Sequence, residues 1–232
     1  MKKLIMLVIP LFLLVTGCEK NPVGALMYPD VNNSIDWNNE FVLYYNGVRT
    51  TGPFDPFKFT NWTDIGAGDL NFDYMKKSYQ GRQSIKMSWT GGNSNPKPSG
   101  APQNVYVGFG MPAKGFYESE AGQPVYQGYD ISKGSYTKMV LYVTGVLRQN
   151  VRLEIKAAVA IGNGAGGNEQ PAGLLYVTIP NDGRWHRIEV PFTNFAALTK
   201  VKTMMSLSMK LIDETLPSNG GEIYIDNIRF VK

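Results

Sequence analysis

The chain of 232 residues contains a single cysteine, Cys18, and a single histidine, His186. One cysteine cannot form a disulfide bond within the chain. His186 stands in phase with Ile188 and Val190, as expected of a packed strand residue, and no serine or cysteine nucleophile motif accompanies it. These shortages argue against catalysis that depends on histidine or on a thiol.

The sequence also lacks runs of basic residues and stretches rich in the helix formers alanine, leucine and glutamate. Its formal charge of +4 falls to about +2 without Lys2 and Lys3, and the remaining basic residues are scattered, so nothing points to nucleic acid as a partner. The sequence is instead rich in glycine, tyrosine and phenylalanine. This composition favours strands and loops.

The N-terminus has the pattern of an export signal. Lys2 and Lys3 precede an apolar run over residues 4–15, and small residues then lead to Cys18. The run of about 12 residues is shorter than the roughly 20 that span a bilayer as a helix. Residues 1–17 are therefore predicted to be a lipoprotein signal peptide, with Cys18 as the residue that receives the lipid. An ordinary secretory signal with an incidental cysteine is the alternative.

Residues 18–38 are polar, contain proline and show no periodicity, so we expect a tether. Residues 39–232 are long enough for one all-β domain and short for two. We therefore expect an exported protein, anchored to the cell envelope by the lipid on Cys18. The outer membrane is the expected location, with surface display as a further option.

From residue 39 onward, apolar and polar residues alternate in short segments separated by turn signals. Residues 151–156 are the clearest example, because Val151, Leu153 and Ile155 are apolar and the residues between them are charged. About nine or ten such segments, without helical periodicity, predict an all-β, antiparallel β-sandwich. Residues 48–71 are expected to form a long loop instead. The predicted strands lie within residues 41–47, 85–89, 104–110, 138–144, 151–156, 174–179, 185–190, 204–212 and 220–232.

The last predicted strand contains a break in its pattern. Ile223 and Ile225 share one face, but Ile228 and Phe230 resume the apolar pattern one residue out of phase. This slip predicts a β-bulge near Asp226, which would aim its carboxylate away from the regular pleat.

The closing sequence Ile-Tyr-Ile-Asp-Asn-Ile-Arg-Phe, residues 223–230, resembles the last strand of jelly-roll carbohydrate-binding modules of families 11 and 4, which have a galactose-binding-domain-like architecture. Similar stretches occur in the family's order at residues 79–84 (Tyr-x-Gly-x-x-Ser), 128–132 (Gly-Tyr-Asp-Ile-Ser) and 185–192 (Trp-x-x-Ile-x-Val-Pro-Phe). The resemblance implies a jelly roll whose ligand is a polysaccharide or oligosaccharide. It also implies that glycan-degrading enzymes or a transporter are neighbours at the cell envelope.

In such modules the outward face of one concave sheet carries the sugar. Charged planar side chains bond two hydroxyls at once, and tyrosine rings stack on the C–H surface of a pyranose. The alternative is a solvated sheet face whose charges only keep the domain soluble. The residues that the resemblance implies for this face, with Tyr129 at its rim, are Tyr106, Arg152, Glu154, Lys156, Ser206, Ser208 and Lys210.

The resemblance further implies a structural calcium ion. In the family an aspartate at the position of Asp226 binds the ion together with an acidic residue of the first strand, where this sequence offers Asn46. The alternative is that Asp226 only accepts hydrogen bonds at the bulge.

Two other functions stay open at the level of sequence. A divergent glycoside hydrolase or lyase would need two carboxylates about 5 to 10 Å apart in one groove, and the Glu-x-Asp-x-x-Glu run of jelly-roll glucanases does not occur. A structural or adhesive lipoprotein subunit would show an exposed apolar patch or an open sheet edge.

Overall fold

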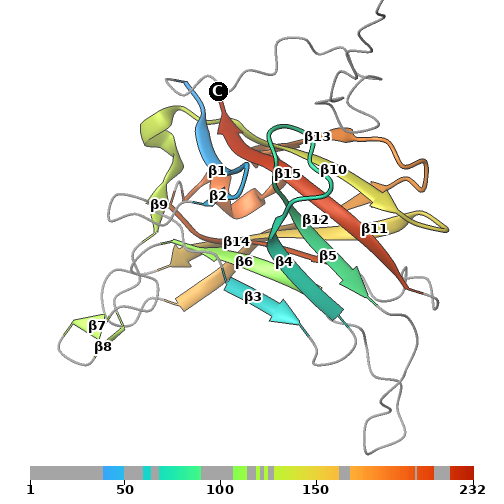
Figure 1. Cartoon of the computed structure of the whole chain (residues 1–232). Coiled ribbons are helices and arrows are strands. Elements are labelled where there is room, and N and C mark those ends of the chain that lie inside the picture. Colours follow the sequence, from blue (N-terminus) through green and yellow to red (C-terminus); the bar gives the residue numbers. More distant parts are fainter. Residues whose placement is uncertain are drawn as a thin grey trace, which may run out of the picture.

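The computed structural model describes residues 39–49, 60–63, 68–89, 107–113, 119–120, 123–124, 128–161, 168–201, 203–211 and 220–232. These residues form two antiparallel sheets packed face to face (Figure 1), which confirms the predicted β-sandwich. Within the described ranges, no helix is long and apolar enough to cross a bilayer. The predicted signal peptide and tether, with Cys18, lie outside the described residues.

The first sheet, which we call the β15 sheet, contains β13 (His186–Pro191), β10 (Lys138–Val146), β15 (Gly221–Val231), β1 (Phe41–Tyr45), β2 (Val48–Arg49), β5 (Ser84–Trp89) and β4 (Gly68–Tyr74). The C-terminal strand β15 is central to it. β10 pairs along one side of β15, whereas β5 and then β1 pair along the other side. The segment that closes the chain therefore connects most of this sheet.

The second sheet, which we call the β11 sheet, contains β12 (Asn168–Ile179), β11 (Val151–Ile161), β14 (Thr203–Leu211), β6 (Val107–Pro112) and β3 (Thr60–Thr63) in that order, with β9 (Tyr129–Asp130) beside β14. A separate hairpin joins β7 (Ser119–Glu120) to β8 (Gln123–Pro124). Short 3-10 turns occur at η2 (Ile131–Gly134), η3 (Phe192–Asn194) and η4 (Ala196–Thr199).

The inner faces of the two sheets form one core. On β11, Val151, Leu153 and Ile155 are fully buried, as their alternation predicted. Burial of such a side chain contributes about 1.5–3 kcal/mol relative to exposure. Residues that join them in the core from β10, β14 and β15 include Met139, Leu141, Val143, Leu207, Met209, Leu211, Ile223, Ile225, Ile228 and Phe230.

The predicted bulge in β15 is confirmed. Val140 pairs with Arg229 and Tyr142 with Asp226, so the register shifts between these two pairs. Asn227 has a φ of 52°, which places its backbone in the left-handed region. The extra residue restores Ile228 to the core face and directs Asp226 toward the opposite side of the sheet.

One expectation about the fold was wrong. Residues 48–71 were expected to be a loop, but they contain β2, β3 and the start of β4. β4 alternates as a strand should, with Leu70 and Phe72 turned toward the core and Asp69 and Asn71 exposed. Two apolar positions among aspartate and asparagine give a weak strand signal, because these polar residues have low β-propensity. Pairing with β5 decides the structure.

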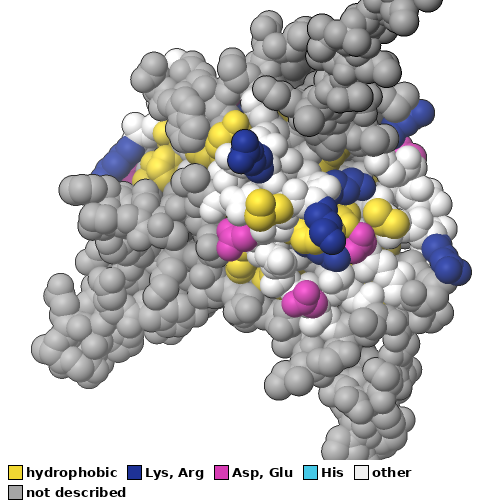
Figure 2. All heavy atoms as spheres, viewed as in Figure 1, with side chains coloured by type: hydrophobic (Ala, Val, Ile, Leu, Met, Phe, Trp, Pro, Cys, Tyr) yellow, Lys and Arg dark blue, Asp and Glu magenta, His cyan; other side chains and the backbone are white. Residues whose placement is uncertain are grey.

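The surface seen in Figure 2 mixes basic, acidic and apolar side chains over the described part of the chain. Large hydrophobic side chains that are exposed among the described residues are Met75, Val146, Leu174 and Tyr176. Two of these, Leu174 and Tyr176, lie on β12 and face the same side of the β11 sheet.

Candidate functional site

The outward side of the β11 sheet carries a cluster of polar side chains from β11 and β14. Glu154 lies opposite Lys210, Lys156 opposite Ser208, and Ala158 opposite Ser206. The residues between them point inward and are buried. The structure thus brings together six of the predicted ligand-binding residues, which we call the polar face: Arg152, Glu154, Lys156, Ser206, Ser208 and Lys210.

β12 adds an aromatic ring beside the polar face. Tyr176 lies opposite Glu154 and is 45% exposed. The guanidinium carbon of Arg152 lies 4.2 Å from the centroid of the Tyr176 ring, a cation–π contact. Sequence reasoning missed Tyr176. In the sequence, Tyr176 alternates with Leu175 and Val177 and therefore shares a face of the strand with Leu174. Because both faces carry apolar residues, the alternation does not show which face is the outer one.

One row of the sheet therefore presents three kinds of contact to a ligand. Tyr176, Glu154 and Lys210 lie side by side on adjacent strands, and directly opposed residues have Cβ atoms about 4.5–5.5 Å apart. Tyr176 and Lys210 lie two strand spacings apart, about 10 Å, with Glu154 between them. The row thus offers a ring face, a carboxylate acceptor and an ammonium donor, which suit the C–H surface and the hydroxyls of sugars.

The neighbouring strand β6 contributes backbone rather than side chains to the same rows. Gly108 lies opposite Lys210, and Gly110 lies opposite Ser208. A Cβ atom added at Gly108 would approach the carbonyl oxygen of Met209 to 2.8 Å, so glycine is required for the close approach of β6 to β14. Tyr106, which the sequence predicted for this face, lies outside the described residues.

Tyr129 does not join the polar face. It lies on β9 opposite the buried residue Met204, and its ring stacks on Phe41 with the centroids 5.1 Å apart. Burial, together with the nearby hydroxyl of Tyr136, raises the pKa of Tyr129 to about 12. Tyr129 therefore lies apart from the polar face, because β9 pairs with β14 in a register that packs this partly buried ring against the core.

The two predicted metal-binding residues hold a loop in place. The fully buried Asp226 accepts hydrogen bonds through Oδ2 from the backbone N–H groups of Tyr79 (2.8 Å) and Gln80 (3.0 Å). Asn46 accepts through Oδ1 from the N–H groups of Arg82 (2.5 Å) and Gln83 (3.2 Å). Both residues therefore fix residues 79–83, the second part of the connection from β4 to β5.

These oxygens do not fit a calcium ion as they lie. Oδ1 of Asp226 accepts the N–H of Asn227 at 2.7 Å, so both carboxylate oxygens face amide hydrogens. Calcium takes six to eight oxygen ligands, and no group of three or more histidine, cysteine, aspartate or glutamate residues gathers in the described part of the chain. Burial raises the pKa of Asp226 to about 7, although the three N–H bonds oppose this shift.

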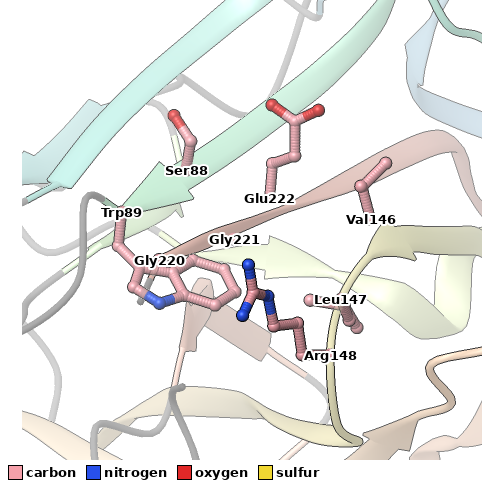
Figure 3. Close-up of a pocket in the computed structure, with 8 residues that line it drawn as sticks. All are labelled: Ser88, Trp89, Val146, Leu147, Arg148, Gly220, Gly221 and Glu222. Atoms are coloured by element: carbon pink, nitrogen blue, oxygen red, sulfur yellow. The ribbon is translucent and has the colours of Figure 1, made fainter. Parts of the chain in front are cut away.

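A pocket of about 460 Å³ lies at one end of the β15 sheet (Figure 3). In this view Ser88 and Glu222 extend to one side of the strands and Trp89 to the other, and the side chain of Arg148 extends from its loop toward the Trp89 ring. Trp89 is only 3% exposed, and its ring packs over Gly221, where a Cβ would come within 2.6 Å of the ring.

The carboxylate in this pocket is already bonded within the sheet. Glu222 lies 2.5 Å from Nζ of Lys86 and accepts a hydrogen bond from the hydroxyl of Tyr224. Burial would raise the pKa of Glu222, but these bonds outweigh it and hold the pKa below its ordinary value. The polar face, with its exposed ring, is therefore the better candidate for a ligand site.

The fold resembles solved carbohydrate-binding modules. A family 30 module from a cellulosomal cellulase of Clostridium thermocellum superposes with a TM-score of 0.53 at 10% identity, covering 83% of this chain and 97% of the module. A second family 30 structure gives 0.53 at 11% identity, with 83% and 98% covered. A family 11 module from Clostridium thermocellum, in complex with a β-1,3-1,4-mixed-linked tetrasaccharide, gives 0.48 at 17% identity, with 83% and 95% covered.

No protein-family model matches the sequence, and the search of curated proteins finds no relative. At 10% and 11% identity the family 30 structures show the fold alone. The chain has the two-sheet β-sandwich fold of jelly-roll carbohydrate-binding modules, as its sequence predicted.

Proposed function

We propose that this protein binds a polysaccharide or oligosaccharide at its polar face without cleaving it, and that a lipid on Cys18 attaches it to the cell envelope. The observation that carries the proposal is the row of Tyr176, Glu154 and Lys210, with Arg152 stacked on the ring. The fold shared with family 30 carbohydrate-binding modules supports the same function. Neighbouring glycan-degrading enzymes or a transporter would be the natural partners.

The polar face offers little for hydrolysis. Of the residues on β11 and β14, Glu154 is the one with a carboxylate, whereas glycoside hydrolysis uses a pair of carboxylates flanking the scissile bond. His186 lies on β13 in the other sheet, with Nε2 2.9 Å from Oδ1 of Asp182. These placements support binding over the hydrolase or lyase alternative.

The adhesive alternative receives less support from the described surface. On the face that Figure 2 shows, apolar side chains of the described residues are interspersed with charged ones. Among the large exposed hydrophobic residues of the described part, Leu174 and Tyr176 are neighbours on one face of β12, whereas Val146 lies on β10 of the other sheet. A protein-binding patch of a few hundred Å² would need such residues to be contiguous.

Affinity electrophoresis of the full chain in detergent, against plant, microbial and host polysaccharides, tests the proposal. The parent is compared with Arg152→Ala and Glu154→Ala, and melting temperatures are measured for all three proteins. We expect one class of glycan to retard the parent but not the variants, at unchanged melting temperature. Failure of every glycan to bind, or equal binding by the variants, would contradict the proposal, and release of reducing ends would then be the next assay.

A further inference from the structure

The polar face carries an excess of positive charge. Arg152, Lys156 and Lys210 are basic, and Glu154 is the acidic residue that β11 and β14 supply. Glu154 lies directly opposite Lys210 and two residues from each of the other two basic residues. One carboxylate balances one of the three cations, so these four side chains retain a formal charge of +2 at neutral pH.

The cations surround the row that would hold a sugar ring. Successive outward residues on a strand are about 6.6–6.8 Å apart, and diagonal neighbours on adjacent strands are about 7–8 Å apart. Arg152 and Lys156 flank Glu154 along β11, and Lys210 lies across from it on β14. A sugar placed over Glu154 therefore has a cation within reach on three sides.

The contact with Tyr176 prepares Arg152 for a planar anion. Its guanidinium carbon lies 4.2 Å from the ring centroid, and stacking on a ring restricts the rotamers of a side chain that is otherwise flexible. A guanidinium held in this way can still donate N–H bonds from its edge, and a paired donor edge matches the two oxygens of a carboxylate or sulfate. Neutral hydroxyls do not require this charge.

We propose, on the basis of the proposed function, that the ligand of the polar face is an anionic polysaccharide, one whose sugars carry carboxylate or sulfate groups. Arg152, Lys156 and Lys210 bind the anionic groups, Tyr176 contacts the ring, and Glu154 accepts hydroxyl hydrogens. The carboxylate of Glu154 also repels an anion placed directly over it. Anionic groups are thereby directed outward to the three cations, which selects how the chain lies on the sheet.

The test uses three probes with the full chain in detergent: polygalacturonate for carboxylates, dextran sulfate for sulfates, and mixed-linkage β-glucan as the neutral glycan. Affinities are measured by calorimetry at low and high salt for the parent, Lys156→Gln, Lys210→Gln and the double variant. Lys76→Gln is the matched control, because this exposed lysine lies between β4 and β5, beside the other sheet.

We expect one polyanion to bind, with an affinity that falls several-fold as salt rises and several-fold again in the double variant, while Lys76→Gln binds like the parent. Which of the two polyanions binds identifies the anionic group. Binding of the β-glucan alone, unaffected by the lysine variants, would overturn this inference and leave the proposed function intact. If Lys76→Gln weakens polyanion binding as much as the lysine variants of the polar face do, the inference is also overturned. Binding would then reflect the overall charge of the protein and not a defined site. If none of the three probes binds, both this inference and the proposed function on which it rests are contradicted.

Discussion

Asn46 and Asp226 accept backbone N–H bonds from opposite ends of the same short loop, residues 79–83. Asn46 follows the first strand of the β15 sheet, and Asp226 lies at the bulge of the last. The loop is fixed further by Tyr79, whose ring stacks on Tyr142 with the centroids 3.8 Å apart. Two residues expected to bind a metal thus act together as hydrogen-bond acceptors that position this loop on the outer side of the sheet.

Asp226→Ala is expected to destabilise the protein by about 3 kcal/mol or more. The substitution leaves the N–H groups of Tyr79, Gln80 and Asn227 without their acceptor, and a buried unsatisfied donor costs about 1–3 kcal/mol. Urea unfolding gives the free energy. Asp69→Ala is the control, because Asp69 is exposed on β4 and such changes stay within about 0.5 kcal/mol. Equal stability of the two variants would contradict the role assigned to Asp226.

The stability of the protein should carry a pH dependence that Asp226 causes. Its folded pKa of about 7 lies above the unfolded value near 3.9, so the folded state binds this proton more tightly. The contribution is complete below about pH 4 and is lost as the pH rises to about 7, with a size on the order of 4 kcal/mol. Melting curves between these values should show the decline in the parent and not in Asp226→Asn, which cannot ionise. Parallel curves for the two proteins would exclude this assignment.

Calcium is expected to leave the melting temperature unchanged. The oxygens of Asp226 and Asn46 already face N–H groups, and these must turn away before a cation can bind. Scanning calorimetry with added calcium and with a chelator provides the measurement. A calcium-dependent rise in melting temperature that Asp226→Asn abolishes would instead establish the structural calcium that the family resemblance implies.

Two tyrosines should respond in opposite ways to truncation. Tyr176→Ala should weaken glycan binding roughly two- to tenfold, because ring stacking contributes about 0.5–1.5 kcal/mol, and the half-exposed side chain should add little to stability. Tyr129→Ala should lower the stability by about 2 kcal/mol and leave the affinity of the folded protein unchanged, because its ring packs against Phe41. Calorimetric binding and urea unfolding of both variants separate the two effects. The reverse pattern would place the ligand near β9 instead.

Cys18→Ala should release the protein from the membrane fraction and abolish labelling by a fatty-acid analogue. The reason is that Cys18 is the only thiol in the chain and follows the predicted signal peptide. Cell fractionation and metabolic labelling of the parent and the variant provide the comparison. A parent protein that is processed and exported but carries no label would favour the ordinary secretory signal.

The sequence by itself determined which side of most strands is buried. A two-residue period fixes the two faces of a strand locally, so the burial of Leu153 and the outward position of Glu154 follow from their neighbours alone. The bulge at Asp226 could also be predicted from local sequence, because the phase of the apolar residues changes within β15 itself.

Only the tertiary structure decided which strands are neighbours. Tyr176 lies beside Glu154 because β12 pairs with β11, and Tyr129 turns inward because β9 pairs with β14 at Met204. Asn46 reaches the 79–83 loop across 36 positions of sequence. Such contacts depend on register and on loop closure between distant segments, and a local pattern of polar and apolar residues contains neither.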